Sequence, residues 1–294
     1  MQAELVFDAR DGVGESPVWI GAQQSLFWVD IPGRRLHRWE VASGRHTEWN
    51  TAEMPACIAP AGEASWVCGM ETGVYRLRLQ DSGEAQAEPV APVRHAGPGM
   101  RFNDGRCDRQ GRLLAGTMAK DMAAARPDGV LYRLQGDGHL QPLVSGLVVP
   151  NGLAFSPDGR TLYLSDSHPS VQAIWSFDYD PDTGLPSNRR LFVDMKPLPG
   201  RPDGAAIDQD GCYWICGNDA GLVHRFTPQG RLDRSLPVPV KKPAMCAFGG
   251  PRLDTLYVTS IRPAGTDLSD QPLAGGLFAL QPGICGLPEP GFAF

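Results

Sequence analysis

Short apolar runs recur along the chain at a nearly constant spacing. The six runs cover residues 26–31, 65–70, 113–118, 162–167, 212–217 and 256–261, and their starts lie about 46 residues apart. Turn-forming sequences, among them several Asp-Gly pairs, precede the runs and supply the positive φ that tight hairpins need. The pattern predicts a repeated unit built around one buried strand.

Further strands are predicted on both sides of each run. The segments that follow alternate apolar and polar residues, which is typical of strands with one buried face, and they cover 34–41, 73–79, 129–134, 172–179, 221–226 and 275–280. Segments that precede the runs cover 14–19, 55–60, 101–108, 150–156, 202–208 and 243–249. An additional strand often ends the unit, as at 46–49, 140–146 and 189–195.

Six units of about four strands predict an all-β fold, a six-bladed β-propeller with four-stranded blades around a central channel. We expect one domain over residues 1–294. Segment 4–9 precedes the first unit, so we expect it to supply the outer strand of the last blade and clasp the ring. A pair of β-sandwiches is the alternative, which the regular spacing disfavours. Segment 118–126 is the only plausible helix, and we expect a loop or a single turn there.

Composition places the chain among ordinary globular proteins. It has 294 residues with 27 Lys+Arg and 33 Asp+Glu, a formal charge of −6, and no basic run, so nucleic acid is a poor candidate for a partner. No stretch of 18 apolar residues predicts a membrane span. Glu4 and Asp8 stand where a signal peptide needs a basic region and an apolar core, so we expect a cytoplasmic protein.

The chain lacks the usual signatures of metal or nucleophilic catalysis. Seven scattered cysteines favour buried reduced thiols over disulfides, and Cys212 and Cys216 lack the further soft ligands of a zinc site. The six histidines are spread singly, so no close metal-binding pair is expected, and His37 and His224 are interpreted as structural. Segment 178–184 resembles an EF-hand start but has Thr183 where that loop needs Gly, which favours a hairpin.

Polar residues stand at the opening position of the first strand, or next to it, in four of the six units. Aligning the six strands places there Glu15, Ala56, Asn103, Asn151, Asp203 and Ala244. The first strands of a propeller line its channel, so four oxygen-bearing side chains are predicted at one mouth. Such a set suits Ca²⁺, Mg²⁺ or Mn²⁺, whereas turn capping is the alternative role for each residue alone.

These segments resemble the SMP-30/gluconolactonase/regucalcin-like family. The resemblance runs from about residue 12 to 282 and rests on GESPVW, MRFNDGRCD, GTM, PNGLAFSPDG, RPDGAAID and CAFGG. It implies a six-bladed propeller and a sugar lactonase that depends on one divalent metal, with Ca²⁺, Zn²⁺, Mg²⁺ or Mn²⁺ as candidates. By motif, the family's metal ligands fall on Glu15, Asn151 and Asp203. Its substrate contacts fall on Arg101, Asn103 and Asp121, the last often Glu in relatives.

The expected function is hydrolysis of a sugar lactone by direct attack of water on a metal-polarised carbonyl. Asp203 is the expected base, and Arg101 stays protonated and cannot serve as one. The first alternative is a calcium-dependent esterase or phosphotriesterase of paraoxonase type. The second is a non-catalytic calcium-binding regulator, against which Arg101 beside Asn103 argues. The small-molecule lactone is the only expected partner, and the oligomeric state stays open.

Overall fold

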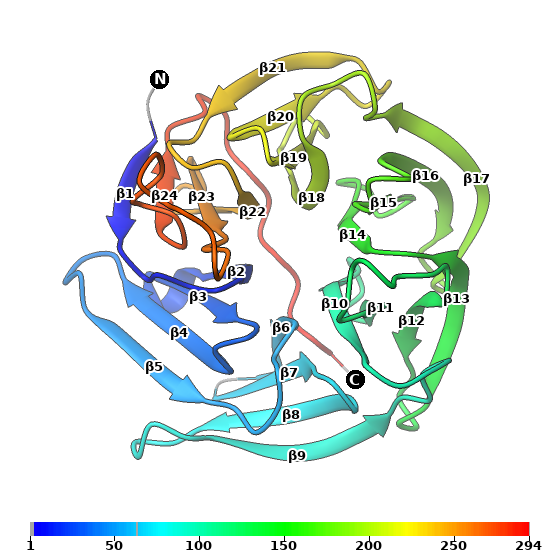
Figure 1. The fold of residues 1–294 in the computed structure, drawn as a ribbon. Coiled ribbons are helices and arrows are strands. Elements are labelled where there is room, and N and C mark those ends of the chain that lie inside the picture. Colours follow the sequence, from blue (N-terminus) through cyan, green and yellow to red (C-terminus); the bar gives the residue numbers. More distant parts are fainter. Residues whose placement is uncertain (1–2, 63, 294) are drawn as a thin grey trace.

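Six four-stranded antiparallel sheets form a ring (Figure 1), and this arrangement confirms the predicted six-bladed β-propeller. The structure, a computed structural model, describes residues 3–62 and 64–293. In each blade the strand order runs from an innermost strand beside the axis to an outermost strand on the rim. We call the space enclosed by the six innermost strands the channel.

The strands of blades 1 to 3 follow one another along the chain. Blade 1 contains β2 (Gly14–Ile20), β3 (Ser25–Asp30), β4 (Arg35–Glu40) and β5 (His46–Asn50), with a single 3-10 turn, η1 (Gly21–Gln23), after β2. Blade 2 contains β6 (Cys57–Pro60), β7 (Ser65–Gly69), β8 (Gly73–Leu79) and β9 (Ala85–Pro92). Blade 3 contains β10 (Met100–Cys107), β11 (Leu113–Ala119), β12 (Gly129–Leu134) and β13 (Leu140–Leu147).

Blades 4 and 5 repeat this order, and blade 6 differs in its last strand. Blade 4 contains β14 (Pro150–Phe155), β15 (Thr161–Asp166), β16 (Ala173–Asp180) and β17 (Leu185–Asp194). Blade 5 contains β18 (Arg201–Ile207), β19 (Tyr213–Asn218), β20 (Leu222–Phe226) and β21 (Leu232–Pro237). Blade 6 contains β22 (Pro243–Gly249), β23 (Thr255–Ser260), β24 (Leu277–Leu280) and β1 (Glu4–Phe7).

The ring closes as the sequence predicts. Strand β1 pairs antiparallel with β24, with Glu4 opposite Ala279 and Leu5 opposite Phe278. An N-terminal strand therefore completes a sheet whose other strands come from the end of the chain, and this closure removes the open edges that a linear array of blades would leave.

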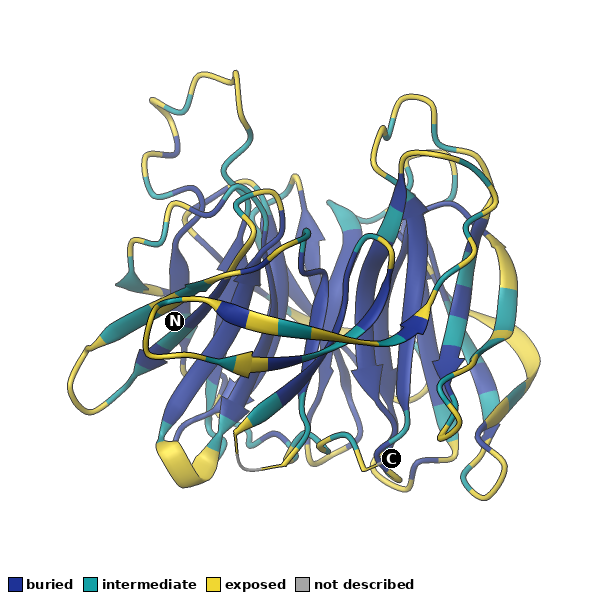
Figure 2. Ribbon diagram, turned by 90° about the horizontal axis from the view of Figure 1, so that it is seen from below, coloured by how far each residue is buried: buried dark blue, intermediate teal, exposed yellow. Residues whose placement is uncertain are grey.

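Burial falls from the axis to the rim (Figure 2). Every residue of β14 is buried, whereas β17 exposes most of its residues, with Leu191 at 62% exposure. The predicted buried thiols are confirmed for six cysteines, and Cys285 is partly exposed. The predicted hairpin at 178–184 is also confirmed, between β16 and β17.

Two segments outside the blades complete the fold. Residues 120–128 form turns rather than a helix, in agreement with the expected loop. Residues 285–293 follow the last blade and run across the ring (Figure 1), a feature that the repeat pattern does not predict. No helix in the described residues has the length and hydropathy of a membrane span.

Candidate functional site

The predicted site residues coincide with breaks in strand pairing. Five of the six innermost strands shift register against their neighbours at the same point, between Glu15 and Val18, Phe102 and Gly105, Asn151 and Ala154, Pro202 and Ala205, and Pro243 and Cys246. A bulge re-aims the side chains at its position. The shifts therefore explain how neighbouring polar residues can leave the ordinary alternation of a strand and become buried beside the axis.

The backbone adopts a positive φ at two of these bulges. Ser16, which follows Glu15, has a φ of 50°, and its N–H donates to Glu15 Oε2 at 3.0 Å. Gly152, which follows Asn151, has a φ of 59°, and a Cβ there would lie 2.4 Å from the Tyr213 hydroxyl oxygen. Glycine is the residue that tolerates both the positive φ and this close approach.

A chain of hydrogen bonds links the predicted residues of blades 3, 4 and 5. Arg101 Nη1 donates to Asn103 Oδ1 at 2.8 Å, and Asn103 Nδ2 donates to the carbonyl oxygen of Pro150 at 3.0 Å. The next residue, Asn151, donates from Nδ2 to Ser167 Oγ at 2.8 Å. The Ser167 hydroxyl then donates to the carbonyl oxygen of Pro202, the neighbour of Asp203. Arg101, Asn103, Asn151 and Asp203 thus belong to one polar network at the starts of three innermost strands.

Glu15 of blade 1 interacts electrostatically with this group. Burial raises the pKa of Glu15 well above its usual range, and the negative charges of Asp203 and Asp104 raise it further. Burial likewise raises the pKa of Asp203 to about 7, although the hydrogen bond from Asn218 opposes the rise. Carboxyl groups that repel one another in a water-poor setting cannot all carry their charge without a cation.

The donor set fits a divalent cation. Asn151 Oδ1 is a buried acceptor with no hydrogen-bond donor in the described part of the chain, and an unpaired buried acceptor is costly. Together with the carboxylates of Glu15 and Asp203 it offers the hard oxygen ligands that Ca²⁺ and similar ions prefer. Glu15, Asn151 and Asp203 are 4–7% exposed, so a cation there would be held by protein oxygens in a largely buried setting.

Arg101 provides positive charge at the edge of this acid group. It is partly buried, and burial lowers its pKa to about 10 while the charges of Glu15, Glu71 and Asp203 oppose that effect. The guanidinium therefore stays protonated at neutral pH. Nη1 also donates to the carbonyl oxygen of Phe102 at 2.7 Å, whereas Nε and Nη2 have no hydrogen-bond partner among residues 3–62 and 64–293. Those two nitrogens are free to donate to a bound molecule.

Asp121 lies apart from the buried group. It is exposed in the turn after β11, where its Oδ1 accepts from the N–H of Ala123 at 2.9 Å. It lines a surface pocket with Gly99, Met100 and Lys120. Met100 is the neighbour of Arg101, but among the described residues Asp121 makes no hydrogen bond to the network described above.

Three residues of the site are not predicted from the sequence. Asp104 is buried with Oδ1 unpaired, and its Oδ2 accepts from the N–H of Leu153 at 2.7 Å. Asn218 Nδ2 donates to Asp203 Oδ2 at 2.6 Å, and Ser167 links Asn151 to Pro202. Asp104 could have been predicted from the sequence, because it is adjacent to Asn103. Asn218 and Ser167 lie outside the innermost strands, so only the folded blade shows that they reach the site.

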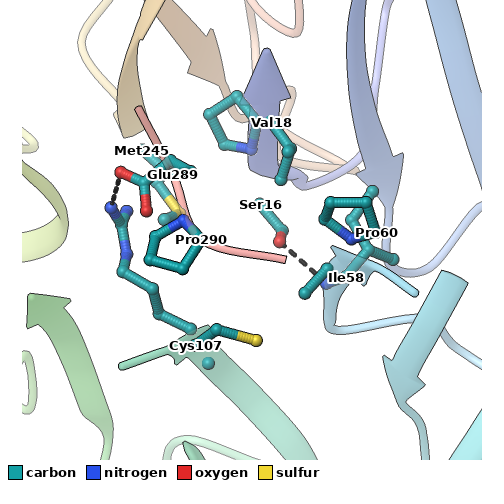
Figure 3. Close-up of a pocket in the computed structure, with 12 residues that line it drawn as sticks. Ser16, Val18, Ile58, Pro60, Cys107, Met245, Glu289 and Pro290 are labelled. Carbon is teal, nitrogen blue, oxygen red and sulfur yellow. Dashed lines mark hydrogen bonds and ion pairs between the residues drawn. The ribbon is translucent and has the colours of Figure 1, made fainter. Parts of the chain in front are cut away.

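The C-terminal segment lies at the opposite end of the channel. The site residues lie at the starts of the innermost strands, whereas residues 285–293 bond near their ends, with the N–H of Phe292 donating to Pro60 O at 2.7 Å. Glu289 forms an ion pair with Arg106, and Glu289 and Pro290 line a pocket with Ser16 and Ile58 (Figure 3). In this pocket Ser16 Oγ accepts from the Ile58 N–H at 2.9 Å (Figure 3).

The expectation that no two histidines lie close together is wrong. His37 Nδ1 and His46 Nε2 are 3.0 Å apart, because the β4–β5 hairpin brings together residues that are nine positions apart in sequence. The structural role of His224 is confirmed, since this buried ring contacts Ser235 Oγ at 2.7 Å and the carbonyl oxygen of Pro199 at 2.9 Å.

Proteins named as sugar lactonases and as regucalcin resemble this chain over nearly its whole length. The chain is 37% identical over 285 residues to 6-deoxy-6-sulfogluconolactonase of Pseudomonas putida, covering 96% of this chain and 95% of that protein. It is 33% identical over 296 residues to pentonolactonase XacC of Haloferax volcanii, covering 98% and 97%. The solved structure of the calcium-binding protein regucalcin from Agrobacterium tumefaciens has a TM-score of 0.91, 29% identity and coverage of 99% and 97%.

A family model gives the same result over most of the chain. The model for the SMP-30/Gluconolactonase/LRE-like region matches residues 13–262, a range that contains every site residue predicted from the sequence. The chain therefore belongs to the SMP-30/gluconolactonase/LRE-like family.

Proposed function

We propose that this protein is a metal-dependent sugar lactonase, acting as one propeller domain over residues 1–294. The observation that carries the proposal is the buried group at the channel mouth, where Glu15, Asp203 and the unpaired Oδ1 of Asn151 lie beside the cationic Arg101. Two relatives that match nearly the whole chain are named as lactonases, which supports the same reaction class.

Glu15, Asn151 and Asp203 would hold the cation. When bound, a divalent ion supplies Lewis-acid polarisation of the lactone carbonyl and stabilises negative charge developing on its oxygen. The donor set contains only oxygen atoms, so Ca²⁺, Mg²⁺, Mn²⁺ and Zn²⁺ are all candidates.

The other steps are assigned to the chain's own groups. Asp203 Oδ2 is held by Asn218, so Oδ1 is the atom that would take the proton from the attacking water. Arg101 and Asn103 would orient the sugar, because Arg101 has free donors and their mutual hydrogen bond holds both side chains in place. Asp121 at the rim would contact a distal hydroxyl of the substrate.

The experiment is a titration of released acid in a pH-stat. The substrates are hexono- and pentonolactones, 6-deoxy-6-sulfogluconolactone, an aryl ester and a phosphotriester, each tested before EDTA, after EDTA and after metal is restored. Acid release from the lactones that stops with EDTA and returns with metal supports the proposal. Preference for the phosphotriester would support the paraoxonase-type alternative, and metal binding without turnover of any substrate would support a regulatory protein.

A further inference from the structure

A second group of potential metal ligands lies far from the channel mouth, in the outer half of blade 1. His37 on β4 and His46 and Glu48 on β5 each present one ligand atom, and the three atoms lie within 4.8 Å of one another. The strand register explains the grouping, because His37 is directly opposite Glu48 and His46 is two residues away on the same face. We propose that these three residues form a second metal site, specific for Zn²⁺ and similar nitrogen-preferring ions.

The distances from His37 Nδ1 to the other two ligand atoms lie on either side of the spacing in a zinc site. His37 Nδ1 is 3.0 Å from His46 Nε2 and 3.8 Å from Glu48 Oε2. Zinc bound tetrahedrally at about 2.0–2.1 Å from nitrogen sets its ligand atoms about 3.4 Å apart. Two imidazoles and one carboxylate provide three ligands, and the fourth position stays open to water because Glu48 is exposed.

A carboxylate and an aromatic ring flank His37. Asp11 Oδ1 lies 3.3 Å from His37 Nε2, and Asp11 Oδ2 accepts from Trp28 Nε1 at 2.7 Å. Nε2 makes no hydrogen bond among the described residues, so the nearby carboxylate is the partner available to it when Nδ1 binds a metal. In the tautomer with the proton on Nε2, Nδ1 would present its lone pair toward His46. Trp28 stacks on His37 with ring centroids 4.9 Å apart, which restrains the ring further.

His46 can present to a metal the same nitrogen that it now presents to His37. Its Nε2 lies 3.0 Å from His37 Nδ1, and moving the ring proton to Nδ1 of His46 frees the Nε2 lone pair without adding or losing a proton. Arg35 would compete with the metal for Glu48, because Arg35 Nη1 lies 3.5 Å from Glu48 Oε2. Both side chains are about half exposed, and ion pairs at the surface are weak.

The position of the site suggests what the ion would do. Phe7 of β1 stacks on His46 with ring centroids 4.3 Å apart, so the cluster lies where the clasping strand of blade 6 meets blade 1 (Figure 1). An ion that binds only the folded chain stabilises it. Zinc bound here would tie β5 to β4 beneath Phe7 and strengthen the closure of the ring, whereas the oxygen site in the channel would keep its own ion.

Calorimetry on the full chain tests the proposal. Zn²⁺ is titrated in a large excess of Ca²⁺, which occupies oxygen sites and competes poorly for imidazole. We expect His46→Gln and Glu48→Gln to lose at least about 100-fold in affinity for one Zn²⁺ per chain, together with the rise in melting temperature that this ion causes in the wild type. Any Zn²⁺ bound in the channel is common to all three proteins. Co²⁺ in place of Zn²⁺ should show the visible absorption of a tetrahedral site in the wild type and lose it in His46→Gln.

His139→Gln is the matched control, because His139 is an exposed histidine beside a carboxylate, Asp137, and lies outside the cluster. It should bind Zn²⁺ like the wild type. Lactone hydrolysis with Ca²⁺ should be unchanged in both cluster variants. Equal Zn²⁺ affinity in the wild type and in Glu48→Gln, whose exposed side chain makes misfolding a poor explanation, would overturn the proposal, as would the absence of binding tighter than millimolar in the wild type.

Discussion

The side-chain amide of Asn218 donates a hydrogen bond of 2.6 Å to Oδ2 of Asp203, and both side chains are buried. Asn218 thereby fixes the rotation of the carboxyl group and lowers its pKa against the effect of burial. Asn218 acts through Asp203, so we assign it as a positioning residue.

Asn218→Ala should therefore weaken metal binding or turnover by about 10–100-fold, the usual effect of losing a group that orients a metal ligand. The midpoint of metal binding should also move to higher pH, because Asp203 loses a donor that favours its ionised form. Calorimetric metal titrations between pH 5 and 8 measure both effects. Asn50→Ala, which removes an exposed amide–carboxylate hydrogen bond to Glu84, is the matched control and should change neither.

Asp203→Asn should fold, bind metal more weakly and lose at least about 10²-fold in kcat, the lower range for removing a general base. The variant keeps the size of the side chain and one oxygen ligand. Assays at saturating metal separate the two roles, since recovery of most activity there would make Asp203 a ligand only. Asp104, with its unpaired Oδ1, would then be the next candidate for the base.

Metal removal should destabilise the protein more at pH 8 than at pH 5. Burial raises the pKa of Glu15 and of Asp203, so between about pH 4 and 7 the metal-free folded chain holds protons that the unfolded chain has released. Its free energy of unfolding accordingly falls as pH rises through that window. Melting temperatures with EDTA and with excess Ca²⁺ at both pH values check this. If the difference in melting temperature between the Ca²⁺ and EDTA samples is the same at pH 5 and pH 8, the prediction is wrong.

Arg101→Ala should lower kcat/KM by about 10–100-fold, because a charged donor to the substrate is worth about 1.5–3 kcal/mol. The melting temperature should change little, since the side chain's protein partners are local, Asn103 Oδ1 and the carbonyl oxygen of Phe102. Steady-state kinetics measure the change in kcat/KM, and a thermal melt measures the change in melting temperature. A large loss of stability with intact kinetics would assign Arg101 a structural role instead.

Glu289→Gln should lower the free energy of unfolding by about 2 kcal/mol and leave kcat/KM unchanged. The Arg106 side chain in this ion pair is 9% exposed, so loss of its partner leaves a largely buried charge, and the partial exposure of Glu289 keeps the cost below the about 3–5 kcal/mol of a fully buried pair. Chemical denaturation measures the change. Asp254→Asn, which removes a partner from the highly exposed Arg252, should cost almost nothing.

The sequence predicts features that repeat and misses those that depend on register. Six recurring strands place Glu15, Asn151 and Asp203 at equivalent positions, so their grouping follows from the repeat alone. Asn218 and Ser167 reach the site from the second strand of a blade or the loop after it, and nothing in their spacing marks them. His37 and His46 meet because of one hairpin register, which a slip of one residue would destroy.

The C-terminal segment joins blades that are far apart in the sequence. Residues 285–293 bond to Pro60 of blade 2, to Arg106 of blade 3 and to Gln209 in the loop that follows β18 of blade 5. One short segment thus links three blades near the ends of their innermost strands. Its loss would remove contacts from all three blades at once, whereas the starts of the innermost strands, where the site residues lie, would keep theirs.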